Sequence, residues 1–164
     1  MDYQIVEKPA FEIFGKAKRV STKDGENMRV IPAFWQESMA GGLFGQLMST
    51  SRHDGIFDDA VLGVCTDFAA DLSEFTYLIA AEKGAAAVAE DFTVVSVAPL
   101  TWAIFHSKGA MPEAIQNVWG YVMGEFFKTS GYEHGHGPDV EVYGPGDPSS
   151  ADYTFEVWVP VVKK

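Results

Sequence analysis

The sequence has little cysteine, few basic residues and no long apolar segment, and each shortage excludes a class of protein. A single cysteine, Cys65, rules out an internal disulfide and makes a reducing cytoplasm the expected compartment. No run of about 18 apolar residues occurs, so we expect no membrane span and no membrane partner. The N-terminus lacks a basic segment followed by an apolar one, so no signal peptide is expected.

Basic residues are scarce, with 12 Lys and Arg against 23 Asp and Glu and a formal net charge of −11. The densest basic spot holds only Lys16, Lys18 and Arg19, whereas binding to nucleic-acid phosphates needs a basic face. We therefore expect no direct contact with nucleic acid. Such an acidic chain attracts cations and basic partners through its overall field, although the same charge also serves simple solubility.

Several chemical motifs are missing too. The sequence contains no phosphate-binding loop, no dinucleotide fingerprint and no Gly-x-Ser-x-Gly nucleophile elbow. His134 and His136 lie near Glu133 and Asp139 in a Gly-rich stretch, but a third and fourth metal ligand at a typical spacing are absent. Cys65 belongs to an apolar run, which predicts a buried structural thiol rather than a nucleophile. We expect neither a metal site nor a cofactor.

Aromatic side chains are abundant by contrast. They make up 13% of the 164 residues and include 12 Phe and 4 Trp. Such an excess fills a core or lines a cavity for a flat or cationic ligand, and the composition leaves both interpretations open. Hydrophobic residues reach 47%, which is typical of a globular chain. The length suits one domain, or two small halves that share a core.

The predicted elements follow the same order twice. In residues 1–84 the pattern predicts strands at 3–6, 10–20, 61–68 and 75–82, with a helix that opens at Pro32 and a shorter helix at 43–48. In residues 91–164 it predicts strands at 92–97 and 100–106, a helix from Pro112 to about Thr129, and a strand pair between Pro138 and Val161. We therefore predict an α+β fold in one domain, residues 1–164. Duplicated β-α-β-β units form one antiparallel sheet, two main helices pack on one side, and a ligand groove lies between the halves.

The C-terminal strand pair places acidic residues beside large aromatic rings. Because side chains alternate across a strand, Glu141 shares a face with Tyr143, and Glu156 shares one with Trp158. A carboxylate in an apolar element costs free energy unless something pairs with it. Glu141 is then either the charge of an aromatic box that binds a cation or a solvent-facing strand residue. Glu156 is either a second pocket acid or a partner for Lys or Arg on a neighbouring strand.

Short motifs in a fixed order carry a resemblance to a known family. They are Ile31–Trp35, Leu62–Val64 with Phe75–Tyr77, Val97–Phe105 closing in Gly109, Ser130–Glu133, Val140–Tyr143 and Tyr153–Val161. In these stretches the chain resembles the gyrase-inhibitor-like, or effector-binding, domain family. The same domain is also found behind the DNA-binding parts of AraC-type and multidrug-sensing regulators.

The resemblance implies a pocket between the two halves that holds lipophilic, often cationic, small molecules. Glu141 matches the acidic residue at the floor of that pocket, and Glu156 and Trp158 match further pocket positions. The other candidate ligand-binding residues are Trp35, Tyr77, Trp102, Trp119 and Tyr143. For any one of these aromatic residues, plain core packing is the alternative. Trp35 and Trp119 stand out because each lies on a helix expected to cover the sheet.

We therefore expect a stand-alone protein that binds a lipophilic, cationic or aromatic small molecule. Strand one begins at about Tyr3, which leaves no room for a DNA-binding part. One alternative is a hydrolase of reactive, cyclopropane-type compounds in which Glu141 is the catalytic residue that activates water. Another is a gyrase-inhibitor-like module that binds a protein partner through its acidic surface.

Overall fold

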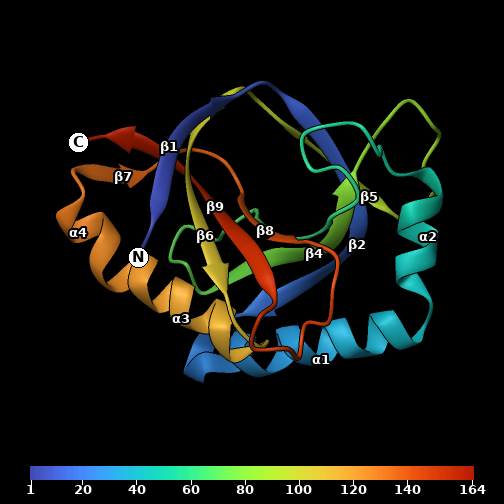
Figure 1. The fold of residues 1–164 in the computed structure, drawn as a ribbon, viewed down its shortest axis with the longest axis horizontal. Helices are drawn as coiled ribbons and strands as arrows, with labels where there is room; N and C mark the ends of the chain where they lie inside the picture. The colour runs from blue at the N-terminus through green and yellow to red at the C-terminus, as the bar shows by residue number, and fades with distance from the viewer.

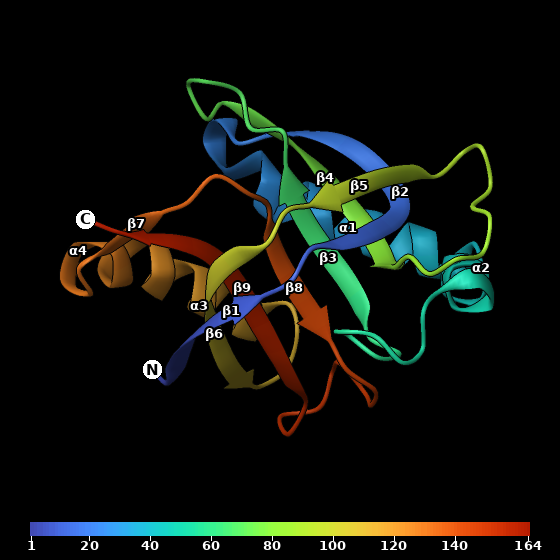
Figure 2. The same ribbon diagram turned by 90° about the horizontal axis from the view of Figure 1, so that it is seen from above.

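Nine strands form one antiparallel sheet in the computed structural model, which describes residues 1–164 (Figures 1 and 2). The strands are β1 (Tyr3–Lys8), β2 (Phe11–Ser21), β3 (Val61–Thr66), β4 (Glu74–Glu82), β5 (Thr93–Val97), β6 (Leu100–Lys108), β7 (Tyr132–His134), β8 (Asp139–Tyr143) and β9 (Thr154–Lys163). Their order across the sheet is β1-β6-β9-β8-β3-β4-β2-β5, and β7 pairs with β9. The predicted α+β fold with one antiparallel sheet is confirmed.

The helices are α1 (Glu26–Ala40), α2 (Leu43–Thr50), α3 (Glu113–Tyr121) and α4 (Phe127–Thr129), with a short 3₁₀ turn at Lys23–Gly25. A π-helical turn, Val122–Phe126, joins α3 to α4, so that the predicted helix up to Thr129 is a continuous run. Figure 1 shows α1 and α3 on the same side of the sheet. None of these helices combines the length and the apolarity needed to cross a membrane.

The predicted start of the first helix was wrong. The helix begins at Glu26, directly after Gly25, whose φ of 68° places it in the left-handed region. Pro32 lies inside the helix, where its missing N–H removes one i to i−4 hydrogen bond but does not end the element. The turn residues before Glu26 were therefore the better start signal, since a glycine with positive φ ends the preceding turn at no steric cost.

The order β-α-β-β recurs as β2-α1-β3-β4 and β6-α3-β8-β9. The two units meet where β3 pairs with β8, and Gly63 and Glu141 lie directly opposite each other in that pair. The two edge strands cross between the halves: β1, from the first half, pairs with β6 of the second unit, and β5, from the second half, pairs with β2 of the first. Each half therefore contributes a strand to the other half's side of the sheet.

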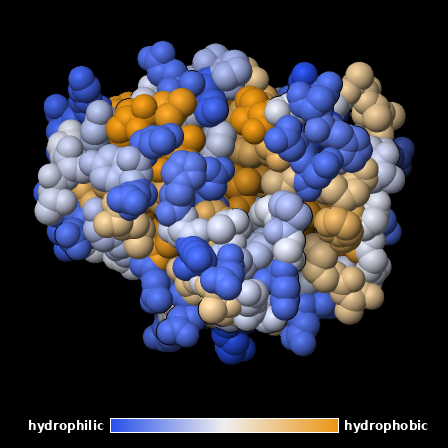
Figure 3. All heavy atoms as spheres, viewed as in Figure 1, coloured by the Kyte–Doolittle hydropathy of each residue, from blue (hydrophilic) through white to orange (hydrophobic).

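The sheet curls, and its two faces bury different clusters (Figure 1). The inside of the curl is filled by residues that include Phe11, Phe57, Trp102 and Trp158. The helix side carries two separate clusters, one under α1 and α2 and one under α3. Figure 3 shows hydrophilic residues over most of this view and apolar atoms in the hollow at its centre.

Candidate functional site

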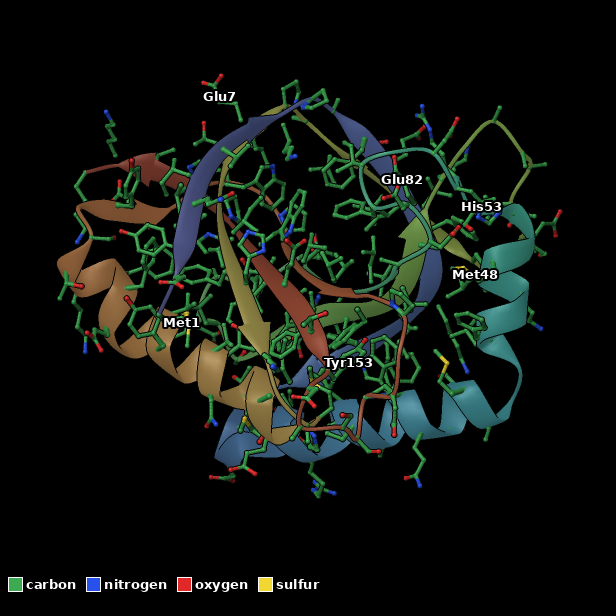
Figure 4. The ribbon with its side chains drawn as sticks, in the orientation of Figure 1. Met1, Glu7, Met48, His53, Glu82 and Tyr153 are labelled. Carbon is green, nitrogen blue, oxygen red and sulfur yellow. The ribbon has the colours of Figure 1, made fainter.

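A cavity of about 1340 Å³ lies on the helix side of the sheet, where the two halves meet. Most of its lining residues are hydrophobic, and they come from α1, α2, α3, β3, β8 and the loops between them. Those that matter below are Trp35, Met39, Trp119, Asp139, Glu141 and Tyr143. Figure 4 labels two others, Met48 on α2 and Tyr153 before β9. The predicted groove between the halves is therefore present.

Glu141 is one of two buried acidic residues of this cavity, and only 5% of it is exposed. Its Oε1 atom accepts hydrogen bonds from the hydroxyls of Tyr77, at 2.6 Å, and Tyr143, at 3.0 Å. Its Oε2 atom accepts one from the indole Nε1 of Trp119 at 2.8 Å. No Lys, Arg or His nitrogen lies within 4.0 Å of the carboxylate. Every group that binds Glu141 is thus electrically neutral.

Trp35 supports this arrangement from the other helix. Its Nε1 atom donates a hydrogen bond to the hydroxyl of Tyr77 at 2.8 Å, which orients that hydroxyl to donate onward to Glu141. The ring of Trp35 also meets the ring of Tyr143 edge-on, with centroids 5.0 Å apart. Each main helix therefore directs one indole N–H at the same carboxylate, Trp119 directly and Trp35 through Tyr77.

The ionisation of these groups follows from their burial. Burial raises the pKa of Glu141 above its ordinary value, and the three hydrogen bonds act in the opposite direction. Burial, together with the charge of Glu141, raises the pKa values of Tyr77 and Tyr143 well above their ordinary range. Both tyrosines therefore keep their protons and remain hydrogen-bond donors to Glu141.

Gly63 makes room for this cluster, a role that the sequence reasoning missed. A Cβ atom at this position would lie 2.2 Å from the hydroxyl of Tyr77 and 2.3 Å from Oε1 of Glu141. Only glycine therefore allows the carboxylate and the hydroxyl to meet over β3. The signal was present in the sequence, because a glycine inside an apolar strand often marks the close approach of another group.

Asp139 is the second acidic residue of the cavity, two positions before Glu141 on the same face of β8. Its Oδ1 atom lies 2.7 Å from Nε2 of His134 on β7. Both histidines of that stretch, His134 and His136, are exposed to solvent. The sequence indicated no role for His134 in this Gly-rich stretch, whereas the structure pairs it with Asp139 of the cavity.

Four candidate site residues do not line this cavity. Tyr77 is fully buried and reaches Glu141 through its hydroxyl, whereas Trp102, Glu156 and Trp158 lie elsewhere. The register pairs Glu156 with Val142 and Trp158 with Val140, and residues directly opposite share a face. They therefore lie inside the curl, away from Glu141. Alternation within the strand correctly predicted that Glu156 and Trp158 share a face, but it could not predict whether that face is also the face of Glu141.

These three residues form their own contacts inside the curl. Glu156 pairs with His106, whose Nδ1 atom is 2.7 Å from Oε2, and accepts a hydrogen bond from the indole of Trp158 at 3.2 Å. Trp102 is fully buried, and its ring packs 5.7 Å from that of Trp158. Of the two alternatives for Glu156, the structure therefore favours a partner on a neighbouring strand, although that partner is His106 and not a lysine or arginine.

Methionine is concentrated around the cavity. The chain has six methionines, and all except Met1 line it: Met28, Met39, Met48, Met111 and Met123. Unbranched thioether side chains adapt to irregular shapes at low cost. Cys65 also lines the cavity, and burial raises the pKa of its thiol well above the ordinary value. It is therefore a wall residue and not a nucleophile.

Comparison with known proteins places the chain among effector-binding proteins. The model of the Cass2 family, described as integron-associated effector binding protein, matches residues 4–161. No curated protein matches the chain at a significant level. Solved structures of low sequence identity share its fold, including three that cover nearly the whole chain.

The first of these structures is SAV2435 bound to tetraphenylphosphonium, with 24% identity and a TM-score of 0.83 over 99% of this chain and 94% of that one. The second is a proposed bacterial transcription regulation protein from Staphylococcus aureus MU50, with 23% identity and a TM-score of 0.81 over 98% of each chain. The third is the integron cassette protein VCH_CASS2 from the mobile metagenome of Vibrio cholerae. It shows 21% identity and a TM-score of 0.63 over 98% of this chain and 95% of that one.

Proposed function

The chain belongs to the Cass2 family of integron-associated effector-binding proteins, and on that premise we propose that it binds a lipophilic cation with Glu141 as the counter-charge. One observation carries the proposal. Glu141 is a buried carboxylate on the wall of a large apolar cavity, and all three of its hydrogen-bond donors are neutral. Buried charges are normally paired. The missing partner is the positive charge of the ligand.

The magnitudes favour a cation over a neutral molecule of the same shape. A positive charge about 4 Å from the carboxylate gains about 4 kcal/mol at the effective dielectric constant of partly buried pairs. The aromatic rings that surround Glu141 add about 0.5–2 kcal/mol for each cation–π contact. The cavity of about 1340 Å³ exceeds the usual range of about 300–1,000 Å³ for ligand pockets, which suits a bulky ligand. The complex of SAV2435 with tetraphenylphosphonium supports the same ligand class for a related fold.

A pair of ligands that differ only in charge tests the proposal. Tetraphenylphosphonium and tetraphenylborate have nearly the same shape and opposite charges. We expect isothermal titration calorimetry to detect binding of the phosphonium only. In Glu141→Gln its affinity should fall by about 10- to 100-fold, which is the loss of about 1.4–3 kcal/mol.

Glu156→Gln is the matched control, because it removes the same charge from the opposite face of the sheet. Its affinity for tetraphenylphosphonium should stay within about twofold of that of the wild type, since only the charge at the cavity contributes. Equal affinities of the wild type and Glu141→Gln would overturn the role of Glu141.

Hydrolysis by the same residue is supported less well. A general base needs a free lone pair for the attacking water, and three of the about four lone-pair positions of a carboxylate are occupied in Glu141. The gyrase-inhibitor-like alternative rests on the overall acidic charge alone. If the wild type turned over a strained electrophile and Glu141→Gln did not, hydrolysis would be favoured over binding alone.

A further inference from the structure

Two carboxylates lie on the floor of the cavity, and their ionisation determines the net charge of that floor. Asp139 and Glu141 are two positions apart on one face of β8, so their Cα atoms lie about 7 Å apart. Asp139 is 8% exposed and lines the cavity. If both residues were ionised without a partner, the floor would carry two negative charges and would favour ligands with two positive charges. Whether Asp139 carries a net negative charge depends on the groups that surround it.

The hydrogen bonds of His134 fix the number of protons at Asp139. Nδ1 of His134 lies 2.6 Å from the carbonyl oxygen of Gly135, and a carbonyl can only accept, so Nδ1 carries a hydrogen. Nε2 lies 2.7 Å from Oδ1 of Asp139, and this contact also needs a hydrogen. That hydrogen belongs either to an imidazolium beside a carboxylate or to a carboxylic acid beside a neutral imidazole. The pair has zero net charge in both arrangements.

We propose that His134 is a specificity-determining residue that neutralises Asp139, so that the cavity floor carries one negative charge, at Glu141, and selects ligands with one positive charge. The proposal rests on the proposed function, because it concerns the ligand class of the same site. His134 acts through Asp139 and contacts no ligand itself, so it is a positioning residue. Asp139 then contributes shape and polarity to the floor but no net charge.

The groups around the pair agree with this assignment. Burial lowers the pKa of His134, but the hydrogen bond and charge of Asp139 and the Gly135 carbonyl outweigh it, so the net shift is upward. Burial raises the pKa of Asp139. The pair loses its shared proton as the pH rises. His134 also contacts the ring of Phe127 on the helix side, with centroids 5.9 Å apart.

Few other titratable groups face the pair. Cys65 lies directly opposite Asp139 on β3, and its raised pKa keeps it neutral. Glu141 is the next residue on the same face, and the hydroxyls of Tyr77 and Tyr143 are directed at Glu141. Asp139 has no ion pair with Lys or Arg. His134 is therefore the one positive charge available to Asp139.

Two isosteric substitutions on the same strand give the sharpest test. Asp139→Asn and Glu141→Gln each replace a buried carboxylate of the cavity floor by an amide. If the His134 pair is neutral, Asp139→Asn removes no net negative charge, and its loss of affinity for tetraphenylphosphonium should be several-fold smaller than that of Glu141→Gln. Glu141→Gln should lose about 10- to 100-fold. A loss in Asp139→Asn as large as that in Glu141→Gln would show that Asp139 acts as an anion and would overturn the proposal.

A second variant releases the charge. In His134→Gln no cation faces Asp139, so its ionisation at pH 8.5 adds a negative charge to the floor. The affinity for a bis(triphenylphosphonium)alkane dication should then rise about tenfold relative to that for tetraphenylphosphonium, and the double variant with Asp139→Asn should cancel this rise. An unchanged ratio of the two affinities at pH 8.5 would contradict the proposal.

The protonation of His134 is measured independently of any ligand. Imidazole ¹⁵N chemical shifts of the wild-type protein should show a hydrogen on Nδ1 between pH 6 and 8, and Asp139→Asn should lower the pKa of His134. A neutral ring with its hydrogen only on Nε2 would overturn the proposal even if cations bind. Conversely, if tetraphenylphosphonium does not bind the wild type, the proposed function fails, while the ¹⁵N shifts still decide whether the pair is neutral.

Discussion

Gly63→Ala is the smallest change that should disable the site. The added Cβ atom would lie 2.2 Å from the hydroxyl of Tyr77 and 2.3 Å from Oε1 of Glu141, far inside van der Waals contact. Gly63 lies in the centre of the sheet, paired with Ile79 on β4 and Glu141 on β8. The backbone is therefore held on both sides, and the side chains above it have to move.

The magnitude follows from the contact that is broken. The hydrogen bond from Tyr77 to the carboxylate, at 2.6 Å, is charge-assisted, and such bonds contribute about 1.5–3 kcal/mol. At roughly 2 kcal/mol, the midpoint of thermal unfolding should fall by about 4–8 °C for a chain of this size. Affinity for tetraphenylphosphonium should fall by about tenfold or more, because Glu141 is displaced from the position in which Trp119 also holds it.

Differential scanning fluorimetry and calorimetric titration measure both effects. Gly45→Ala is the control, since a Cβ at this position of α2 would meet nothing within 4 Å and alanine in a helix is favoured over glycine by about 0.5–1 kcal/mol. The control should be as stable as the wild type or more so, with unchanged affinity. If Gly63→Ala behaves like Gly45→Ala, the close packing of Tyr77 and Glu141 over β3 is refuted.

Three further predictions concern the same site. Because burial raises the pKa of Glu141, affinity for tetraphenylphosphonium should weaken by up to tenfold per pH unit as the pH falls below that pKa, and the affinity of Glu141→Gln should not change over this range; a flat wild-type profile would argue against an ionised Glu141. Tyr143→Phe removes one donor to the carboxylate, so calorimetry should show a several-fold loss of affinity and a midpoint of the pH profile shifted upward, whereas an unchanged midpoint would count against that hydrogen bond. Replacing Met39 and Met48 together by isoleucine stiffens two lining residues and should narrow the range of cation sizes that bind. Replacing the same two residues by leucine should leave that range unchanged. Equal ranges for the two double variants would argue against a role of side-chain flexibility.

The part of the site that the sequence could predict is the part that local rules govern. Glu141 and Tyr143 share a face because they are two residues apart on one strand, and the structure places both on the cavity wall. Trp35 and Trp119 could be assigned to the covering helices, because apolar residues recur at helical spacing around them. The order of elements, which recurs in the two halves, was sufficient to predict one antiparallel sheet with the two main helices on the same side.

What could not be predicted depends on contacts between distant segments. Whether Glu156 lies on the same face as Glu141 depends on the register between β8 and β9, and a slip of one residue would reverse the answer. The assignment of His134 to Asp139 needs the pairing of β7 with β9, which a three-residue strand in a Gly-rich stretch does not reveal. Gly63 acquires its role only from two side chains on neighbouring strands.

The duplicated fold itself explains why only one of the two opposed positions, 63 and 141, carries a carboxylate. Gly63 and Glu141 face each other across the central pair of strands, one from each half. Equivalent acidic residues at both positions would have their Cβ atoms about 5 Å apart, and two buried carboxylates at that distance cannot both ionise. A carboxylate on β8 and a glycine on β3 resolve the conflict. The glycine admits the Tyr77 hydroxyl, through which the first half's Trp35 reaches the same charge that the second half's Trp119 binds directly. Both halves thus contribute hydrogen bonds toward the carboxylate of Glu141.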